Sequence, residues 1–238
     1  MAFFTDKKEG LQFSERKPLK EAEKEEKEEQ EDQQPASGGR LAVFQTKTSQ
    51  QMRRIASEAA IEENMPWHWQ PGVAYHCFSF GDVDSLTYLK IAIRQQPLDY
   101  VYLSTWCMAN ADIFLIREWL EKGLLKRIDF YVGEIFNARY SYEYGLLLEL
   151  CKDYPECRVA IFRNHAKIMG GIGPKFAFVS ESSANVNTNP RSEQTTVTIE
   201  EDLFWWYKDI FDQVTTFDRT QQQDQRERWR PWQAEHRN

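Results

Sequence analysis

The chain has 238 residues, of which 41% are hydrophobic and 14% aromatic, so it is long enough for one sizeable domain with a buried core. Its formal net charge is −7, which is not the basic surplus that usually marks a nucleic-acid-binding protein, so such a function would need a local basic cleft. Four cysteines form no CxxC pair and match no zinc-ligand spacing, so the sequence signals neither a zinc site nor a disulfide framework.

Compartment is the next property that the sequence indicates. No stretch approaches the roughly 18 apolar residues of a membrane span, and the first residues, "MAFFTDKKEG", lack the apolar core of a signal peptide. Cys77 and Cys107 lie in apolar runs, where buried free thiols are expected, and such thiols fit a reducing compartment. We therefore expect a soluble, cytoplasmic protein without a membrane span.

Two polar tails flank the expected domain. Residues 1–40 contain a charged run without aromatics and end in a Pro/Ser/Gly linker, which predicts a disordered or helical charged tail; it either solubilises the chain or binds a partner that the sequence does not identify. Residues 218–238 form a polar C-terminal tail with several Arg and two Trp, which either folds back on the domain or stacks on nucleic acid. The domain itself is expected over residues 41–217.

The first element expected in the domain is a helix over residues 48–64. Its apolar residues recur with helical spacing and roughly fill one face: Met52, Ile55, Ala56, Ala59 and Ile61.

From residue 74 onward, strand patterns and helix patterns alternate. We expect strands over 74–80, 99–108, 124–136, 158–170 and 175–182, and helices over 81–96, 111–123, 141–155 and 200–217. Asp82 and Asp84 mark one helix start, and Pro97 and Gly123 mark two helix ends. Strands separated by helices of this length predict an α/β fold, with a largely parallel sheet that carries helices on both faces.

A histidine and a lysine stand two residues apart in the segment "NHAKIM". On an extended chain, His165 and Lys167 point to the same side while Ala166 points to the other. Two groups that can be cationic are costly side by side unless an anion lies between them, and a phosphate group meets that need. The lysine would bind a phosphate oxygen, and the imidazole could act as a nucleophile or an acid.

A polar loop follows the next strand and adds donors to the same face. Ser182, Ser183 and Asn185 supply hydroxyl and amide groups, which could stabilise negative charge on phosphate oxygens in a transition state. Glu193 could accept a hydrogen bond from the imidazole and hold its other nitrogen ready to attack, as the carboxylate of a catalytic triad does. His68 and His76 have no such neighbours, and we assign them no role.

These elements, "HAK" at 165–167, "SSAN" at 182–185 and "NPRSE" at 189–193, resemble the half-motif of the phospholipase D superfamily. That motif runs H-x-K, then GS-x-N, then a carboxylate that orients the histidine. The resemblance implies a phospholipase D-like mixed sheet flanked by helices on both faces, with His165, Lys167, Asn185 and Glu193 as catalytic residues and Ser182 and Ser183 as substrate-binding residues. Two positions depart from the motif: Ile172 stands where the family has Asp, and Ser182 stands where it has Gly.

The resemblance also implies an activity. One half-motif supplies one histidine, and superfamily members with a single copy dimerise, so the expected protein is a homodimer with a shared site. It would be a metal-independent nuclease without a cofactor, cleaving nucleic-acid phosphodiesters through a phosphohistidine intermediate. The alternative is a catalytically decayed module that binds nucleic acid or a protein partner, as the departures at Ile172 and Ser182 would indicate. A phospholipid phosphodiesterase is a further alternative, which the missing membrane-binding signals disfavour.

Overall fold

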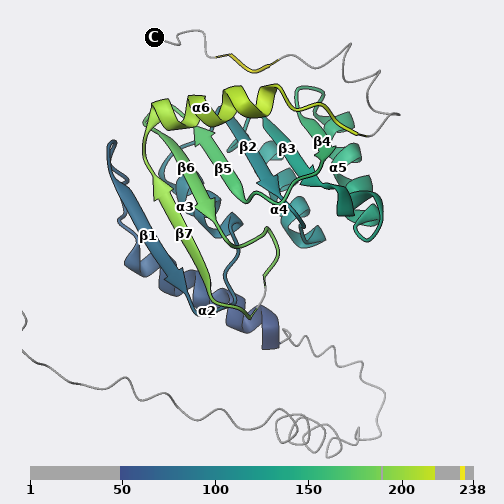
Figure 1. The fold of residues 1–238 in the computed structure, drawn as a ribbon. Helices are drawn as coiled ribbons and strands as arrows, with labels where there is room; N and C mark the ends of the chain where they lie inside the picture. The colour runs from purple at the N-terminus through teal and green to yellow at the C-terminus, as the bar shows by residue number, and fades with distance from the viewer. Residues whose placement is uncertain (1–48, 189, 218–230, 234–238) are drawn as a thin grey trace, which may run out of the picture. The chain divides into compact units, whose positions relative to one another are not determined.

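The structure is a computed structural model that describes residues 49–188, 190–217 and 231–233 (Figure 1). The expected N-terminal tail, residues 1–40, and most of the expected C-terminal tail lie outside these residues. Within the described part, seven strands alternate with five α-helices and one short 3₁₀ helix. In chain order these are α2 (Ser49–Asn64), β1 (Ala74–Ser79), α3 (Leu86–Gln95), β2 (Tyr100–Thr105), α4 (Asn110–Glu121), β3 (Ile128–Gly133), η1 (Glu134–Asn137), α5 (Ser141–Asp153), β4 (Arg158–Phe162), β5 (Ile168–Ile172), β6 (Ala177–Ser182), β7 (Glu193–Thr198) and α6 (Glu201–Asp212).

The seven strands form one mixed sheet in the order β1-β7-β6-β5-β2-β3-β4. Only β2, β3 and β4 pair in parallel, through the crossover helices α4 and α5. The other four pairings are antiparallel, which corrects the expectation of a largely parallel sheet. The reason is that β5, β6 and β7 are joined by short connections, and short connections can link only antiparallel neighbours.

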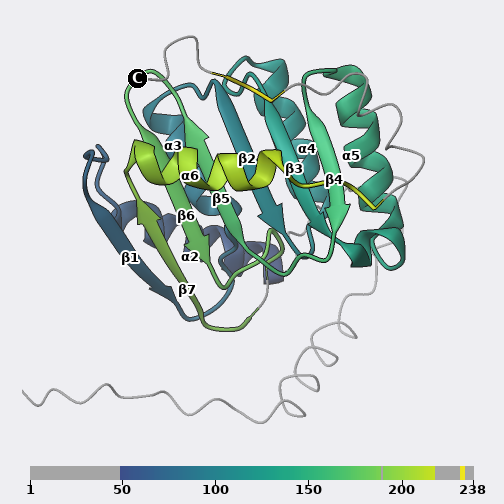
Figure 2. The ribbon, with the colours of Figure 1, turned by 45° about the horizontal axis from the view of Figure 1, so that its top comes forward.

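Helices cover both faces of the sheet, as Figure 2 shows with α6 crossing one face and α3, α4 and α5 behind the other. The central strands β2 and β3 are buried along their whole length, as strands covered on both faces must be. The larger core lies on the α3–α5 face and includes Leu103, Phe130 and Phe178, whereas the smaller core beneath α6 includes Tyr102, Tyr131 and Phe204. The predicted α/β fold, a mixed sheet with helices on both faces, is confirmed.

Two predictions about strands are wrong. The segment 158–170 is not one strand: β4 ends at Phe162, β5 begins at Ile168, and the chain between them reverses direction. The sequence analysis also missed β7, whose residues "EQTTVT" are polar because the sheet is covered only in part at this position. Both differences matter for function, because His165 and Lys167 lie between β4 and β5, and Glu193 begins β7.

The expected apolar face of the first helix is buried only in part. Helix α2 has the predicted bounds to within one residue, but Ile55, Ala56 and Ala59 are exposed, whereas Ile61 is half-buried and packs against the larger core. The side chains that turn toward the domain include Arg54 and Glu58, which form buried ion pairs. Hydrophobic periodicity could not find this face, because charged residues occupy it.

Part of the C-terminal segment contacts the domain. Trp232 stacks on Tyr100 and Trp205, with ring centroids 5.0 Å and 5.7 Å apart, so this part of the C-terminal segment packs on the domain.

No helix among the described residues is both long enough and apolar enough to cross a membrane. Within the same residues, no three His, Cys, Asp or Glu side chains gather as metal ligands would.

Candidate active site

The candidate site lies at the edge of the sheet where the parallel strands β2, β3 and β4 have their carboxyl ends. The strand directions also bring the end of β6 and the starts of β5 and β7 to this edge. Ligand sites in open α/β sheets are usually found at such an edge, because the loops there are free to vary. His165, Lys167, Asn185 and Glu193 all belong to segments that meet here.

His165 and Lys167 lie in the extended segment just before β5, not on a strand, and their side chains touch. The Lys167 ammonium Nζ is 2.9 Å from Nδ1 and 3.3 Å from Nε2 of the imidazole, and it donates to the His165 carbonyl oxygen at 2.7 Å. His165 is exposed and Lys167 is half-buried. The two side chains therefore lie side by side as predicted, but they do so on an extended segment and not on a strand.

Asn164 fixes the backbone of this segment. Its buried carboxamide donates to the Ser104 hydroxyl at 2.9 Å and to the Tyr131 carbonyl at 2.8 Å, and it accepts from the Ala166 amide at 3.0 Å. The Ser104 hydroxyl in turn donates to the Ala166 carbonyl at 3.2 Å. A buried amide with its hydrogen bonds satisfied by two strands holds the neighbouring histidine backbone in a defined place.

Trp106 packs against the imidazole. The centroids of the Trp106 and His165 rings are 5.6 Å apart. Gly133, at the end of β3, leaves room for this arrangement: a Cβ there would lie 2.8 Å from Trp106 Cδ1 and 2.9 Å from the Asn164 carbonyl oxygen. The ring of His165 thus contacts both the Trp106 indole and the Lys167 ammonium.

Asn185 is hydrogen-bonded to Thr105, the last residue of β2, and to Trp106, which follows it. Its carboxamide oxygen accepts from the Trp106 amide at 3.2 Å and from the Thr105 hydroxyl at 3.4 Å. The next residue, Val186, donates its amide to the same hydroxyl at 3.2 Å and accepts from the Ala109 amide at 2.9 Å. Because β2 uses the carboxamide oxygen, the amino group of Asn185 is directed elsewhere, where it could donate to a ligand oxygen. Asn185 and His165 therefore share Trp106 as a neighbour.

Ser182 and Ser183 use their hydroxyl groups within the loop itself. The Ser182 hydroxyl lies 2.7 Å from that of Thr195 and accepts from the Ala184 amide at 3.0 Å. The Ser183 hydroxyl accepts from the Gln194 amide at 3.0 Å and donates to the Glu193 carboxylate. The two serines thus connect the end of β6 to the start of β7, and a substrate-binding role for their hydroxyls stays a prediction.

The electrostatic environment of Lys167 links it to Glu193. Burial lowers the pKa of the Lys167 ammonium below its usual value, while the nearby Cys107 and Glu193 act in the opposite direction. Glu193 is half-buried and lies on the same face of the sheet as Lys167 and Ser182, as the register of β5, β6 and β7 requires. The predicted hydrogen bond between Glu193 and His165 stays a prediction.

The sequence analysis missed three residues of this site: Asn164, Thr105 and Trp106. Thr105 ends β2, Trp106 follows it, and Asn164 immediately precedes the histidine. Correct strand boundaries were therefore the only sequence signal that could have indicated these residues. The misplaced boundary between β4 and β5 concealed that signal for Asn164.

Comparison with known proteins gives structural likenesses only. No protein-family model matches the chain, and no curated protein matches its sequence. Among solved structures, it is similar to polyphosphate kinase from Porphyromonas gingivalis (16% identity, TM-score 0.45), to phosphatidylserine synthase from Haemophilus influenzae Rd KW20 (15%, 0.42) and to NucT from Helicobacter pylori (14%, 0.41).

The matched regions differ in extent. They cover 62%, 59% and 59% of this chain, and 27%, 37% and 94% of those three chains in the same order, so the match spans well under half of the first two. In the residues of its motif, the chain resembles the phospholipase D superfamily.

Proposed function

We propose that the chain is a phosphodiesterase of phospholipase D type, with nucleic acid as its substrate. The observation that supports this most is the contact between the His165 imidazole and the Lys167 ammonium, at the edge of the sheet that also carries Asn185 and Glu193. A nucleophile, a phosphate-binding cation, an amide donor and a carboxylate are the groups that phosphodiester cleavage through a covalent intermediate requires.

In the proposed reaction, Nε2 of His165 attacks the phosphorus atom, an N–P bond forms, and one P–O ester bond breaks. The phosphate takes the place of the imidazole as the partner of the Lys167 ammonium, which releases the ring for attack. The Asn185 amino group and Lys167 stabilise the charge that develops on the phosphate oxygens. Glu193 stabilises the imidazolium that the N–P bond creates, and water then releases the product and restores His165.

The leaving oxygen needs a proton that a single site histidine cannot supply while it acts as the nucleophile. We propose that a second copy of the chain supplies it, through its own His165, in a homodimer whose two-fold axis passes beside the site. In the second step the imidazole that protonated the leaving oxygen acts as the base that activates water, while the other imidazole is released from phosphorus.

A catalytically decayed module is the second candidate, and one substitution favours it. Ile172, where the family has Asp, lies in β5 opposite Tyr100 and Ala177 and packs against the apolar core beneath α6. An isoleucine there cannot supply a charge to the site. Under this candidate, the chain binds nucleic acid or a protein partner without cleaving a phosphodiester bond.

Cleavage assays separate the two candidates. Purified protein, His165→Ala and the control His68→Ala are incubated in EDTA with single-stranded and double-stranded DNA and RNA. The control removes an exposed histidine from a loop remote in sequence from the site. The proposal predicts cleavage in EDTA by the wild type and by His68→Ala, but not by His165→Ala. Binding without cleavage by all three proteins would support the decayed module, and cleavage that EDTA stops would contradict the metal-independent mechanism.

A further inference from the structure

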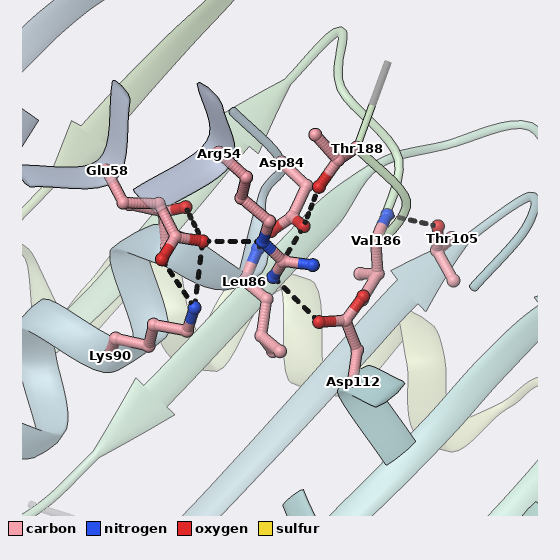
Figure 3. Close-up of polar contacts among 10 residues, drawn as sticks. Arg54, Glu58, Asp84, Leu86, Lys90, Thr105, Asp112, Val186 and Thr188 are labelled. Atoms are coloured by element: carbon pink, nitrogen blue, oxygen red, sulfur yellow. Dashed lines mark hydrogen bonds and ion pairs between the residues drawn. The ribbon is translucent and has the colours of Figure 1, made fainter. Parts of the chain in front are cut away.

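A cluster of five charged residues, two of them buried and three half-buried, lies between helix α2 and the starts of α3 and α4, and Figure 3 shows it. We call it the buried ion cluster; its members are Arg54, Glu58, Asp84, Lys90 and Asp112. The exposed fraction of every one of these side chains is 19% or less, and that of Asp84 is 0%. Ionic groups are buried to this extent only where each has a partner, so the arrangement constrains the elements that carry it.

Arg54 joins the other members. Its guanidinium Nη2 lies 2.9 Å from Asp84 Oδ2 and 2.8 Å from Asp112 Oδ1, and its Nε donates to Glu58 at 2.9 Å. Asp84 lies two residues before the first residue of α3, and Asp112 lies in the first turn of α4. One side chain from α2 therefore holds the starts of two helices together.

The start of α3 is also bound to the loop that carries Asn185. Asp84 Oδ2 accepts from the Thr188 hydroxyl at 3.0 Å, and the Ser85 amide donates to the Asn185 carbonyl oxygen at 3.2 Å. The other carboxylate oxygen of Asp84 accepts from the Leu86 amide at 2.9 Å, which caps the helix. Asp84 is thus shared by Arg54, by the helix start and by the loop, as Figure 3 makes plain.

Removal of the guanidinium would disturb this arrangement in a predictable direction. Asp84 and Asp112 would lose the cation that they share and would be left as two buried carboxylates. Their negative charges would then repel each other. The start of α3 would move to relieve that repulsion, and the Asn185 loop, bound at two points to it, would move as well. A displacement of about 1 Å at a catalytic group can cost roughly 10²-fold in rate.

We propose that Arg54 is a positioning residue, which fixes the Asn185 loop through Asp84 and Thr188. The inference rests on the proposed function, because it assigns the loop a place in the phosphodiester site. Arg54 does not touch the substrate; it keeps the Asn185 amino group at the place where it meets a phosphate oxygen.

The test compares variants that cut the connection at two points with matched controls. Arg54→Met removes the charge, and Thr188→Val removes only the hydroxyl that reaches Asp84. The control Arg94→Met breaks an exposed ion pair with Glu62 between the same two helices, α2 and α3. The second control, Thr188→Ser, keeps the hydroxyl and removes only the methyl group. Hydrogen exchange of the backbone amides in residues 183–188 is measured for each, with the amides of α5 as the reference, together with kcat and KM for cleavage of an oligonucleotide.

For Arg54→Met and Thr188→Val, we expect exchange in residues 183–188 to accelerate about tenfold or more while α5 keeps its protection. In both variants kcat should fall about tenfold or more with KM nearly unchanged, because an amide that meets the transition state is misplaced. Thr188→Ser and Arg94→Met should behave like the wild type. Where Arg54→Met does not fold, Thr188→Val decides the question.

Unchanged exchange of the loop in Thr188→Val would overturn the inference, and so would equal acceleration in α5, since both would mean that the contact has no local effect on Asn185. A wild type without cleavage would contradict the proposed function instead. The exchange measurement would still decide whether the buried ion cluster holds the loop, so the two failures can be told apart.

Discussion

Two polar regions of this molecule differ in how their charges are held. In the buried ion cluster, every charged side chain has a partner of opposite charge within 3.0 Å and little contact with solvent. At the candidate site, His165 is exposed, Lys167 is half-buried, and the positions are set mainly by backbone contacts through Asn164 and the end of β2. Buried pairs are costly to break, whereas exposed charges contribute little to stability. Substitutions in the first region should therefore affect stability and the position of the Asn185 loop, whereas substitutions in the second should affect the chemistry directly.

The largest expected effect is that of Glu193→Gln at the candidate site. The change keeps the shape and an acceptor oxygen but removes the charge that stabilises cationic His165, so turnover should fall by on the order of 10²–10⁴. Oligonucleotide cleavage measures the effect, and thermal unfolding should be unchanged. Glu156→Gln, at an exposed position, is the control. Unchanged turnover would mean that Glu193 serves only its contact with Ser183 in the loop.

Lys167→Met should have the next largest effect. It removes the cation that meets the phosphate but keeps the length of the side chain, so kcat/KM should fall by about 10²–10³, the range for loss of one strong donor to a developing charge. Steady-state kinetics measure it, beside Lys175→Met, which removes an exposed ammonium at the opposite edge of the sheet. Equal kcat/KM values for the two variants would show that Lys167 does not bind the phosphate.

Gly133→Ala tests the positions of Trp106 and Asn164. An added Cβ would lie 2.9 Å from the Asn164 carbonyl oxygen, so the backbone before His165 must shift, and we expect kcat to fall about tenfold. The matched control is Gly145→Ala in α5, where a Cβ meets nothing within 4 Å. Wild-type kinetics in Gly133→Ala would show that the site tolerates movement of this segment.

The smallest effect concerns stability in the buried ion cluster. Burial raises the pKa of Asp112 to about 6, and the neighbouring Asp84 adds to this, while Arg54 and Lys90 oppose it. The ordinary value is 3.8, so the folded chain binds more protons than the unfolded chain between about pH 4 and pH 6, and the free energy of unfolding falls as the pH rises through that window. Asp112→Asn cannot ionise and should flatten this slope.

The difference in free energy of unfolding between Asp112→Asn and the wild type should therefore shift in favour of the variant as the pH rises from about 4 to about 6, and it should be constant below about pH 4. Urea unfolding across this pH range measures this difference. A parallel pH dependence in the two proteins would contradict the assignment of the excess proton to Asp112.

The sequence predicted the parts of the fold that follow from apolar periodicity. The alternation of helices and strands from β1 to β4, and the helices over both faces, follow from buried strands and amphipathic helices. Two of the features that the sequence did not predict have a common cause: β7 and the inner face of α2 are made largely of polar residues, and tertiary hydrogen bonds and ion pairs define them. A single sequence does not show which polar residues will be paired in that way.

For the candidate site, the motif named His165, Lys167, Asn185 and Glu193, and the structure brings the segments that carry them to one edge of the sheet, while the roles of these residues stay predictions. The motif could not indicate that Asn164 and Thr105 fix the backbone beside them, because those contacts join residues about 60 to 80 positions apart.

The central claim is that His165 carries the covalent intermediate, and trapping that intermediate tests it most directly. An oligonucleotide with internally labelled phosphates is mixed with excess protein and quenched in alkali, which preserves the N–P bond, and the labelled peptide is then identified by mass spectrometry. We predict label on the peptide that contains His165, sensitive to acid, and none in His165→Ala. Hydrolysis by the wild type with no labelled protein, or with label on another residue, would contradict the claim.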